Sequence, residues 1–301
     1  MSNVTTPRDA ILMKSATVAS VAVAAGLILI KLVAYIMSGS VALLASLIDS
    51  LIDLVASIVN LFAVRHSLEP ADMEHRFGHG KAEPIAGMIQ GAFIAGSSMF
   101  LFFEAGFRLL NPHRIAYANI SIAVMVISLV LTIMLVIFQQ YVVKETSSVA
   151  IKADSIHYLS DILQNIGVLL ALILSTKFSL PMADPLIALV IGIYILYSAW
   201  QIVRQSFNQL MDRELSDEDR DRIRVIALSY PLVKNMHELR TRHSGRDIFI
   251  QFHLEMDGNL TLYKAHEIAD SVEESIREAF PNADVIIHED PEGIFERRQP
   301  V

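Results

Sequence analysis

Two pairs of metal-ligand residue types, each with a spacing of four, stand out in apolar parts of this chain. The pairs are Asp49 with Asp53 and His157 with Asp161. A spacing of four puts both members of a pair on one face of an α-helix, one turn apart. An ionisable side chain at the middle of a bilayer costs roughly 2.5–3.5 kcal/mol on insertion scales, so such residues are expected to be functional. Three carboxylates and one imidazole form a set that suits a tetrahedral divalent ion, zinc above all.

The composition is that of a membrane protein. Of 301 residues, 53% are hydrophobic and only 19% are charged. Six apolar runs each reach the ~20 residues that a spanning helix requires. They cover Ala16–Met37, Val41–Val64, Ala82–Leu110, Ile115–Val143, Ser147–Phe178 and Leu180–Val203. Because the connections are short, we expect a multi-pass bundle of antiparallel neighbours with six transmembrane helices in a lipid bilayer.

The flanks of these runs predict the orientation of the bundle. Lys and Arg gather on one set of connections, so both termini are expected to be cytoplasmic. Asp53 and Asp161 then each lie about a dozen residues from the end at which their helix enters, near the middle of a ~30 Å apolar layer. The two pairs therefore meet at one depth. Lys31, near the outer end of the first run, is expected to extend towards the lipid headgroups.

The chain changes character after about residue 210, which predicts a membrane domain (residues 1–210) and a cytoplasmic domain (residues 211–301). Acidic residues are dense in the second part, which contributes to the net charge of −8 and argues against nucleic-acid binding. Its patterns predict a small α+β fold of αββαβ order. The expected elements are helices at Ser216–Ser229 and Leu262–Phe280, and strands at His237–His243, Ile248–Met256 and Val285–Glu289. Ser216 is placed to cap the first helix.

Two further groups of ligand types lie outside the spans. The connection after the second run carries Asp72, His75 and His79, at i, i+3 and i+7, with glycines that let the backbone fold around a cation. A metal site and a solvated loop beside lipid headgroups both stay open there. The cytoplasmic part has a group that favours metal binding: His237, His253, His266, His288 and Asp290. Since the chain has no cysteine, His, Asp and Glu must hold any metal.

Taken together, these residues resemble the cation diffusion facilitator family, most closely its bacterial antiporters for ferrous iron and zinc. The resemblance rests on the six spans, the two four-residue pairs, the Asp-xx-His-xxx-His loop and the histidine-bearing cytoplasmic part. It implies a homodimer of the bacterial inner membrane that exports Zn²⁺, and also Cd²⁺ or Fe²⁺, from the cytosol in exchange for H⁺ by alternating access. His157 matches the zinc- and cadmium-type members.

The resemblance also implies roles for particular residues. The cytoplasmic part should fold like a metallochaperone and bind two zinc ions with Asp290 as the bridge, and how the four histidines divide between the ions stays open. Lys81 and Asp212 should form a salt bridge near the dimer interface. Zinc in the loop and the cytoplasmic part is either regulatory or structural.

Two other classes of function compete with a transporter. An intramembrane metalloenzyme needs an open coordination position and a general base. Four protein ligands leave no such position and the chain has no HExxH motif, so we expect no enzyme activity. A metal channel, or a sensor that reports cytosolic zinc, stays open from the sequence.

Overall fold

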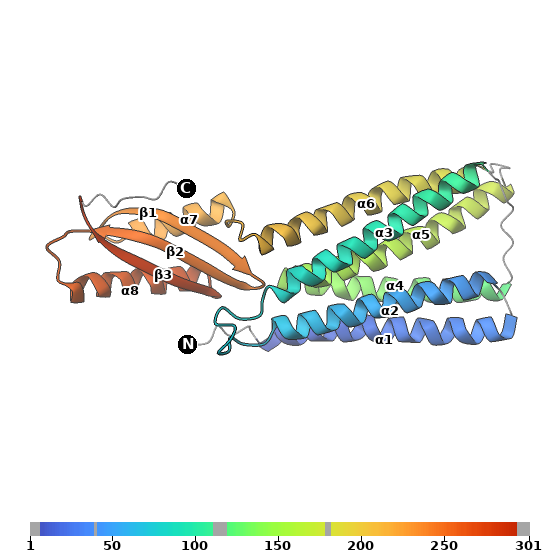
Figure 1. The fold of residues 1–301 in the computed structure, drawn as a ribbon, viewed down its shortest axis with the longest axis horizontal. Helices are drawn as coiled ribbons and strands as arrows, with labels where there is room; N and C mark the ends of the chain where they lie inside the picture. The colour runs from blue at the N-terminus through green and yellow to red at the C-terminus, as the bar shows by residue number, and fades with distance from the viewer. Residues whose placement is uncertain (1–6, 39–40, 111–118, 178–181, 294–301) are drawn as a thin grey trace. The chain divides into compact units, whose positions relative to one another are not determined.

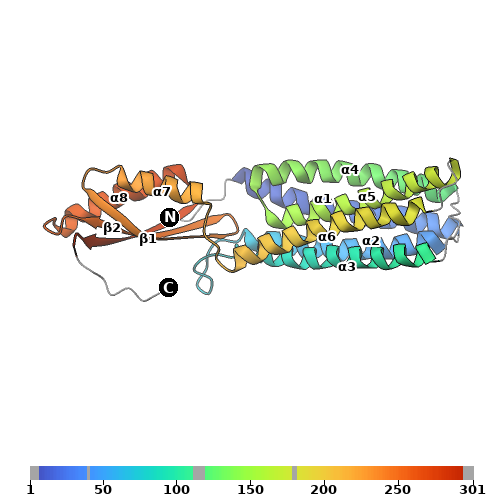
Figure 2. The same cartoon turned by 90° about the horizontal axis from the view of Figure 1, so that it is seen from above.

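The computed structural model describes residues 7–38, 41–110, 119–177 and 182–293 (Figures 1 and 2). Within them the chain forms eight helices and three strands. The contacts divide the molecule into two units. The first contains residues 6–69 and 81–207, and the second combines residues 70–80 with the chain from residue 208 onward.

Six long helices build the first unit and confirm the predicted six-helix region. They are α1 (Pro7–Ser38), α2 (Val41–Ser67), α3 (Ala82–Leu110), α4 (Asn119–Thr146), α5 (Val149–Lys177) and α6 (Ala183–Leu210). In the described part of the chain, five of them are long and apolar enough to cross a membrane. The sixth, α5, carries Lys152, Asp154, His157 and Asp161 within about three turns, as expected of a helix that presents polar groups inside a bundle.

Some helices extend beyond the apolar runs from which they were predicted. The run Ala82–Leu110 coincides with α3, but α1 starts at Pro7 and α6 continues to Leu210, both beyond their apolar runs. Apolarity marks what lipid can surround, whereas a helix continues into polar turns whose backbone stays hydrogen-bonded. The predicted starts of the fourth and sixth runs, Ile115 and Leu180, lie outside the described residues.

The second unit has the predicted αββαβ order. Its elements are α7 (Asp217–Leu228), β1 (Val233–Ser244), β2 (Asp247–Met256), α8 (Leu262–Ala279) and β3 (Ala283–Pro291). The strand order is β1-β2-β3, with β2 antiparallel to β1 and parallel to β3. Figure 2 shows both helices on one face of the sheet. The Ser216 side chain accepts the Asp219 backbone N–H and caps α7, as predicted.

Alternation along β2 separates the two faces of this sheet. Ile250, Phe252 and Leu254 are fully buried in the core against α7 and α8. Because side chains alternate along a strand, Gln251 and His253 point to the opposite face. The face that carries the predicted ligands is thus the one that the helices leave uncovered.

Candidate metal centre

The two intramembrane pairs come together between α2 and α5. His157 Nε2 lies 2.9 Å from Asp53 Oδ1, and both residues are buried. Asp53, His157 and Asp161 each offer a ligand atom, and these atoms lie within 4.8 Å of one another. That separation is close to the spacing of ligands around a single ion, since metal–ligand bonds are about 2 Å long.

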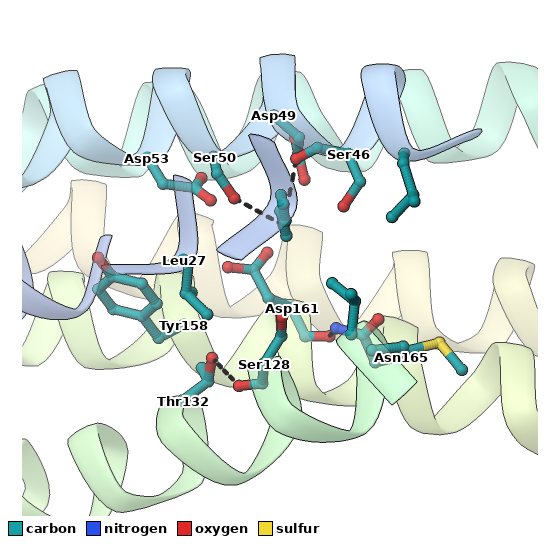
Figure 3. Close-up of a pocket in the computed structure, with 14 residues that line it drawn as sticks. Leu27, Ser46, Asp49, Ser50, Asp53, Ser128, Thr132, Tyr158, Asp161 and Asn165 are labelled. Carbon is teal, nitrogen blue, oxygen red and sulfur yellow. Dashed lines mark hydrogen bonds between the residues drawn. The ribbon is translucent and has the colours of Figure 1, made fainter. Parts of the chain in front are cut away.

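Asp49 lies on the same cavity as this trio. The cavity has a volume of about 150 Å³ and is lined from α1, α2, α4 and α5 by residues that include Asp49, Asp53 and Asp161 (Figure 3). This volume is enough for water molecules or an ion with part of its hydration shell. The Asp49 side chain is not one of the three that converge, so a fourth bond from it would need a shift of the side chain or of α2.

Lys31 also faces this cavity, which corrects the expectation that it extends to the headgroups. Its Nζ donates to Ser50 Oγ at 2.6 Å and to the Ser46 carbonyl at 3.1 Å, and the residue is only 9% exposed. The expectation was wrong because it used only the position of Lys31 along α1. The face of α1 that packs on α2 decides the direction of this side chain.

A second buried carboxylate, Asp154, lies three residues before His157 and was not singled out from the sequence. It accepts hydrogen bonds from Ser20 Oγ at 2.6 Å, Gln139 Nε2 at 2.7 Å and Gln90 Nε2 at 3.2 Å. These donors come from α1, α4 and α3, so Asp154 joins α5 to three other helices. The available signal was a second acidic residue in the fifth apolar run, besides Asp161.

Tyr158 supports the face of α5 that carries the candidate ligands. Its hydroxyl lies 2.8 Å from Ser57 Oγ, and Ser57 stands one turn beyond Asp53 on α2. Its ring meets the His157 ring edge-on, with 5.6 Å between centroids. Asp53 with His157 and Ser57 with Tyr158 therefore form two successive polar contacts between α2 and α5, which fix the imidazole.

The loop residues form a second compact group. Asp72, His75 and His79 offer ligand atoms within 4.8 Å of one another, with Asp72 Oδ1 3.5 Å from His75 Nδ1 and Oδ2 3.5 Å from His79 Nε2. The backbone N–H groups of His75 and Glu74 donate to Asp72 and hold the pKa of its carboxyl below the usual range. Asp72 is therefore ionised and available to a cation at neutral pH.

This loop packs on the β1–β2 hairpin of its own unit. The Arg242 guanidinium lies 5.1 Å from the Phe77 ring centroid and 4.7 Å from that of Phe249, and the two rings meet edge-on. A Cβ at Gly80 would clash with the Ser244 carbonyl oxygen, so only glycine allows this approach. Phe77 and Gly80, on either side of His79, thereby hold this end of the loop against the sheet.

Sheet register assembles the third group. His237 pairs with His253 across β1 and β2, and His253 pairs with His288 across β2 and β3, so three imidazoles form one row. Asp290 Oδ2 lies 2.8 Å from His253 Nδ1 and 3.3 Å from His237 Nε2, and its Oδ1 lies 3.1 Å from His288 Nε2. The two oxygens of one carboxylate thus face different histidines, the arrangement that a bridging ligand needs.

His266 stands apart from this row. It is on α8, with 65% of its side chain exposed, and its near carboxylates are Asp270 at 3.5 Å and Glu289 at 3.9 Å. It is not part of the trio that converges within 4.8 Å, which consists of His237, His253 and Asp290. Within one chain, the sequence-predicted set therefore divides into four residues on the open face of the sheet and one on a helix.

The predicted bridge between Lys81 and Asp212 would join residues of different units and stays a prediction. Within the second unit, Asp212 lies 3.4 Å from Arg242 Nη1. Arg242 thus contacts both the connection after α6 and the aromatic pair that holds the loop.

Family models cover almost all of the described chain. The model of the cation efflux transmembrane domain matches residues 17–211, and that of the cation efflux protein cytoplasmic domain matches residues 215–292. The chain belongs to the cation efflux family. It is accordingly a multi-pass membrane transporter that exports divalent metal ions, and not an enzyme.

Relatives of this cation efflux protein align over nearly their full length. The cation-efflux pump FieF of Serratia proteamaculans (strain 568) is 48% identical over 285 residues, 95% of each chain. The pump of the same name from Klebsiella pneumoniae (strain 342) is 47% identical over 294 residues, 95% of this chain and 98% of its own. Among solved structures, the metal-bound C-terminal domain of the CzcD transporter from Thermotoga maritima is 30% identical, covering 26% of this chain and 93% of that one, with a TM-score of 0.26.

Proposed function

We propose that this cation efflux protein is a secondary antiporter that exports Zn²⁺ from the cytosol in exchange for H⁺. Asp49, Asp53, His157 and Asp161 form its transport site. The 2.9 Å contact between His157 Nε2 and Asp53 Oδ1 carries this proposal. Ligands on two separate helices can move apart to release an ion, whereas ligands on one rigid element would retain it.

The same contact supports proton coupling. A nitrogen and a carboxylate oxygen 2.9 Å apart share a hydrogen, because neither lone pair would otherwise face the other. A metal ion needs both lone pairs, so its binding expels that proton, and release lets a proton return. Uptake of metal from one side and of protons from the other then follows from opening the site alternately to the two faces.

The second unit and the loop supply accessory zinc sites in this proposal. Asp290 bridges two ions, with His237 and His253 on one side and His288 on the other. His266, which lies apart from them on α8 within one chain, is proposed as the remaining ligand. Asp72, His75 and His79 hold a further ion. Cd²⁺ and Fe²⁺ can share such nitrogen and oxygen ligands.

The proposed protein is organised as a membrane domain of residues 1–210 and a cytoplasmic domain of residues 211–301. It works as a homodimer in the bacterial inner membrane, with both termini in the cytoplasm and a Lys81–Asp212 salt bridge near the dimer interface. The sheet face that carries the histidine row supports dimerisation, because α7 and α8 leave it open to a second copy.

The test is flux through the purified full-length protein in sealed liposomes. Zinc uptake is followed with a lumenal zinc dye and proton movement with a pH dye, under an imposed proton gradient. We expect saturable zinc uptake with proton counterflow in the unmodified protein and none in Asp53→Ala. Asp257→Ala removes a carboxylate from an exposed turn and serves as the matched control, with flux like that of the unmodified protein.

Two results would contradict the antiporter. Zinc flux that rises linearly with concentration and moves no protons would indicate a channel. Zinc binding without any flux would indicate a sensor. Equal zinc flux in Asp53→Ala and the unmodified protein would instead refute the assignment of the transport site.

A further inference from the structure

The transport cavity contains one basic side chain whose position the proposed metal ligands do not explain. Lys31 reaches into it from α1, and two of the three N–H bonds of its ammonium donate to Ser46 and Ser50 of α2. The residue is nearly buried at 9% exposure. A cation that lies among the ligands of a cation transporter repels the transported ion, so its presence needs a reason.

The electrostatic surroundings of Lys31 supply that reason. Lys31 lines one cavity with Asp49, Asp53 and Asp161, which are the three acidic members of the proposed transport site. Figure 3 shows these three residues around one cavity, with Ser50 between the two α2 carboxylates. Both contacts of the Lys31 Nζ are to uncharged oxygens, so its charge is balanced by the transport site as a whole.

We propose that Lys31 is a tethered cation that sets the charge of the transport cavity to match a single divalent ion. This inference rests on the proposed transport site. Three ionised carboxylates and one ammonium leave two negative charges, which one M²⁺ neutralises while His157 binds it as a neutral imidazole. A loaded cavity without net charge is the least costly to hold inside a low-dielectric membrane.

Removing the charge of Lys31 should change zinc affinity in the direction opposite to the one that a purely structural role predicts. With three negative charges unopposed, the cavity binds Zn²⁺ more tightly and releases it more slowly. We expect the Zn²⁺ dissociation constant and the KM of transport to fall by about tenfold and the turnover rate to fall with them. A lysine that only holds α1 against α2 would give the opposite result, a looser site with a higher KM.

Four variants of the full-length protein test this inference. Lys31→Gln keeps a hydrogen-bond donor and removes the charge, and Lys31→Arg keeps the charge. Asp49→Asn lowers the negative charge, and the double variant Lys31→Gln with Asp49→Asn restores the original balance. Lys14→Gln removes an equal charge from an exposed position on α1 and is the matched control.

Zinc affinity is measured by calorimetry in detergent, and KM and turnover in the liposomes described above. We expect affinity to decrease in the order Lys31→Gln, the unmodified protein, the double variant and then Asp49→Asn, because the double variant restores the charge balance but lacks one ligand carboxylate. Lys31→Arg should recover most of the turnover that Lys31→Gln loses, and Lys14→Gln should leave KM unchanged. Asp53→Ala is the transport-dead reference.

An unchanged or raised KM in folded Lys31→Gln overturns the inference. If Lys31→Gln alone does not fold, the comparison of Asp49→Asn with the double variant decides, and equal or weaker zinc binding by the double variant overturns it. A failure of the transport proposal is distinguishable, because the unmodified protein itself would then move no zinc.

Discussion

Replacing Asp154 tests whether its hydrogen bonds stabilise the helix bundle around the transport site. Asp154→Ala deprives three buried donors of their acceptor: Ser20 Oγ, Gln139 Nε2 and Gln90 Nε2. Ser20 Oγ can still donate to the Ala16 carbonyl at 3.1 Å, and one N–H of Gln139 still donates to Ser20 at 2.9 Å. About two donors are therefore left unsatisfied, one N–H each of Gln139 and Gln90. Each costs ~1–3 kcal/mol, which predicts a loss of roughly 2–6 kcal/mol in the free energy of unfolding.

The assay is thermal unfolding of the full-length protein in detergent, followed by the loss of its size-exclusion peak. A loss of that size corresponds to a fall in Tm of roughly 3 °C or more, since 1 kcal/mol shifts Tm by ~2–4 °C in chains of 150–250 residues and by less in longer ones. Asp154→Asn keeps one acceptor oxygen and should fall between the alanine variant and the unmodified protein. Glu145→Ala, at an exposed position on α4, is the matched control and should shift Tm by less than about 1 °C.

The order of the Tm values of these variants tests whether Asp154 stabilises the bundle by accepting hydrogen bonds. A Tm for Asp154→Ala within about 2 °C of the unmodified value would show that the network does not stabilise the bundle. Equal losses for the alanine and asparagine variants would show that accepting hydrogen bonds is not what this residue contributes.

Three further predictions concern the metal groups. His157→Asp gives an all-oxygen ligand set, so discrimination against Mn²⁺ in the liposome assay should weaken, and unchanged selectivity would mean that the imidazole does not contact the ion. Asp290→Asn should lower the zinc bound per chain by about two ions, as measured by elemental analysis. It should also abolish any zinc-dependent change in the distance between spin labels on the two cytoplasmic domains. Undiminished zinc content would refute the bridging role of Asp290. Phe77→Ala removes ring contacts worth ~1–3 kcal/mol, so limited proteolysis within residues 70–80 should accelerate several-fold, and an unchanged cleavage rate would contradict the proposed docking of the loop.

Local periodicity in the sequence was enough to predict the long helices, the strand β2 and the helix faces that carry the candidate ligands. Spacing of four places Asp49 with Asp53, and His157 with Asp161, on single helix faces, whatever the rest of the fold does. The length of the apolar runs predicts the long helices, and alternation in β2 predicts a strand with a core face and a polar face. These are properties of one element and its solvent, which is why one sequence suffices to determine them.

Only the tertiary structure decided which faces of the helices and strands contact one another. The rotation of α1 about its axis, set by packing on α2, turns Lys31 into the cavity rather than towards lipid headgroups. The hydrogen bonds of Asp154 join residues from four helices, and no spacing within α5 encodes them. Strand register, fixed by pairing between distant segments, aligns His237, His253 and His288 and leaves His266 on a helix away from them. The sequence supplied the ligand types, and long-range packing decided which of them share an ion-sized space.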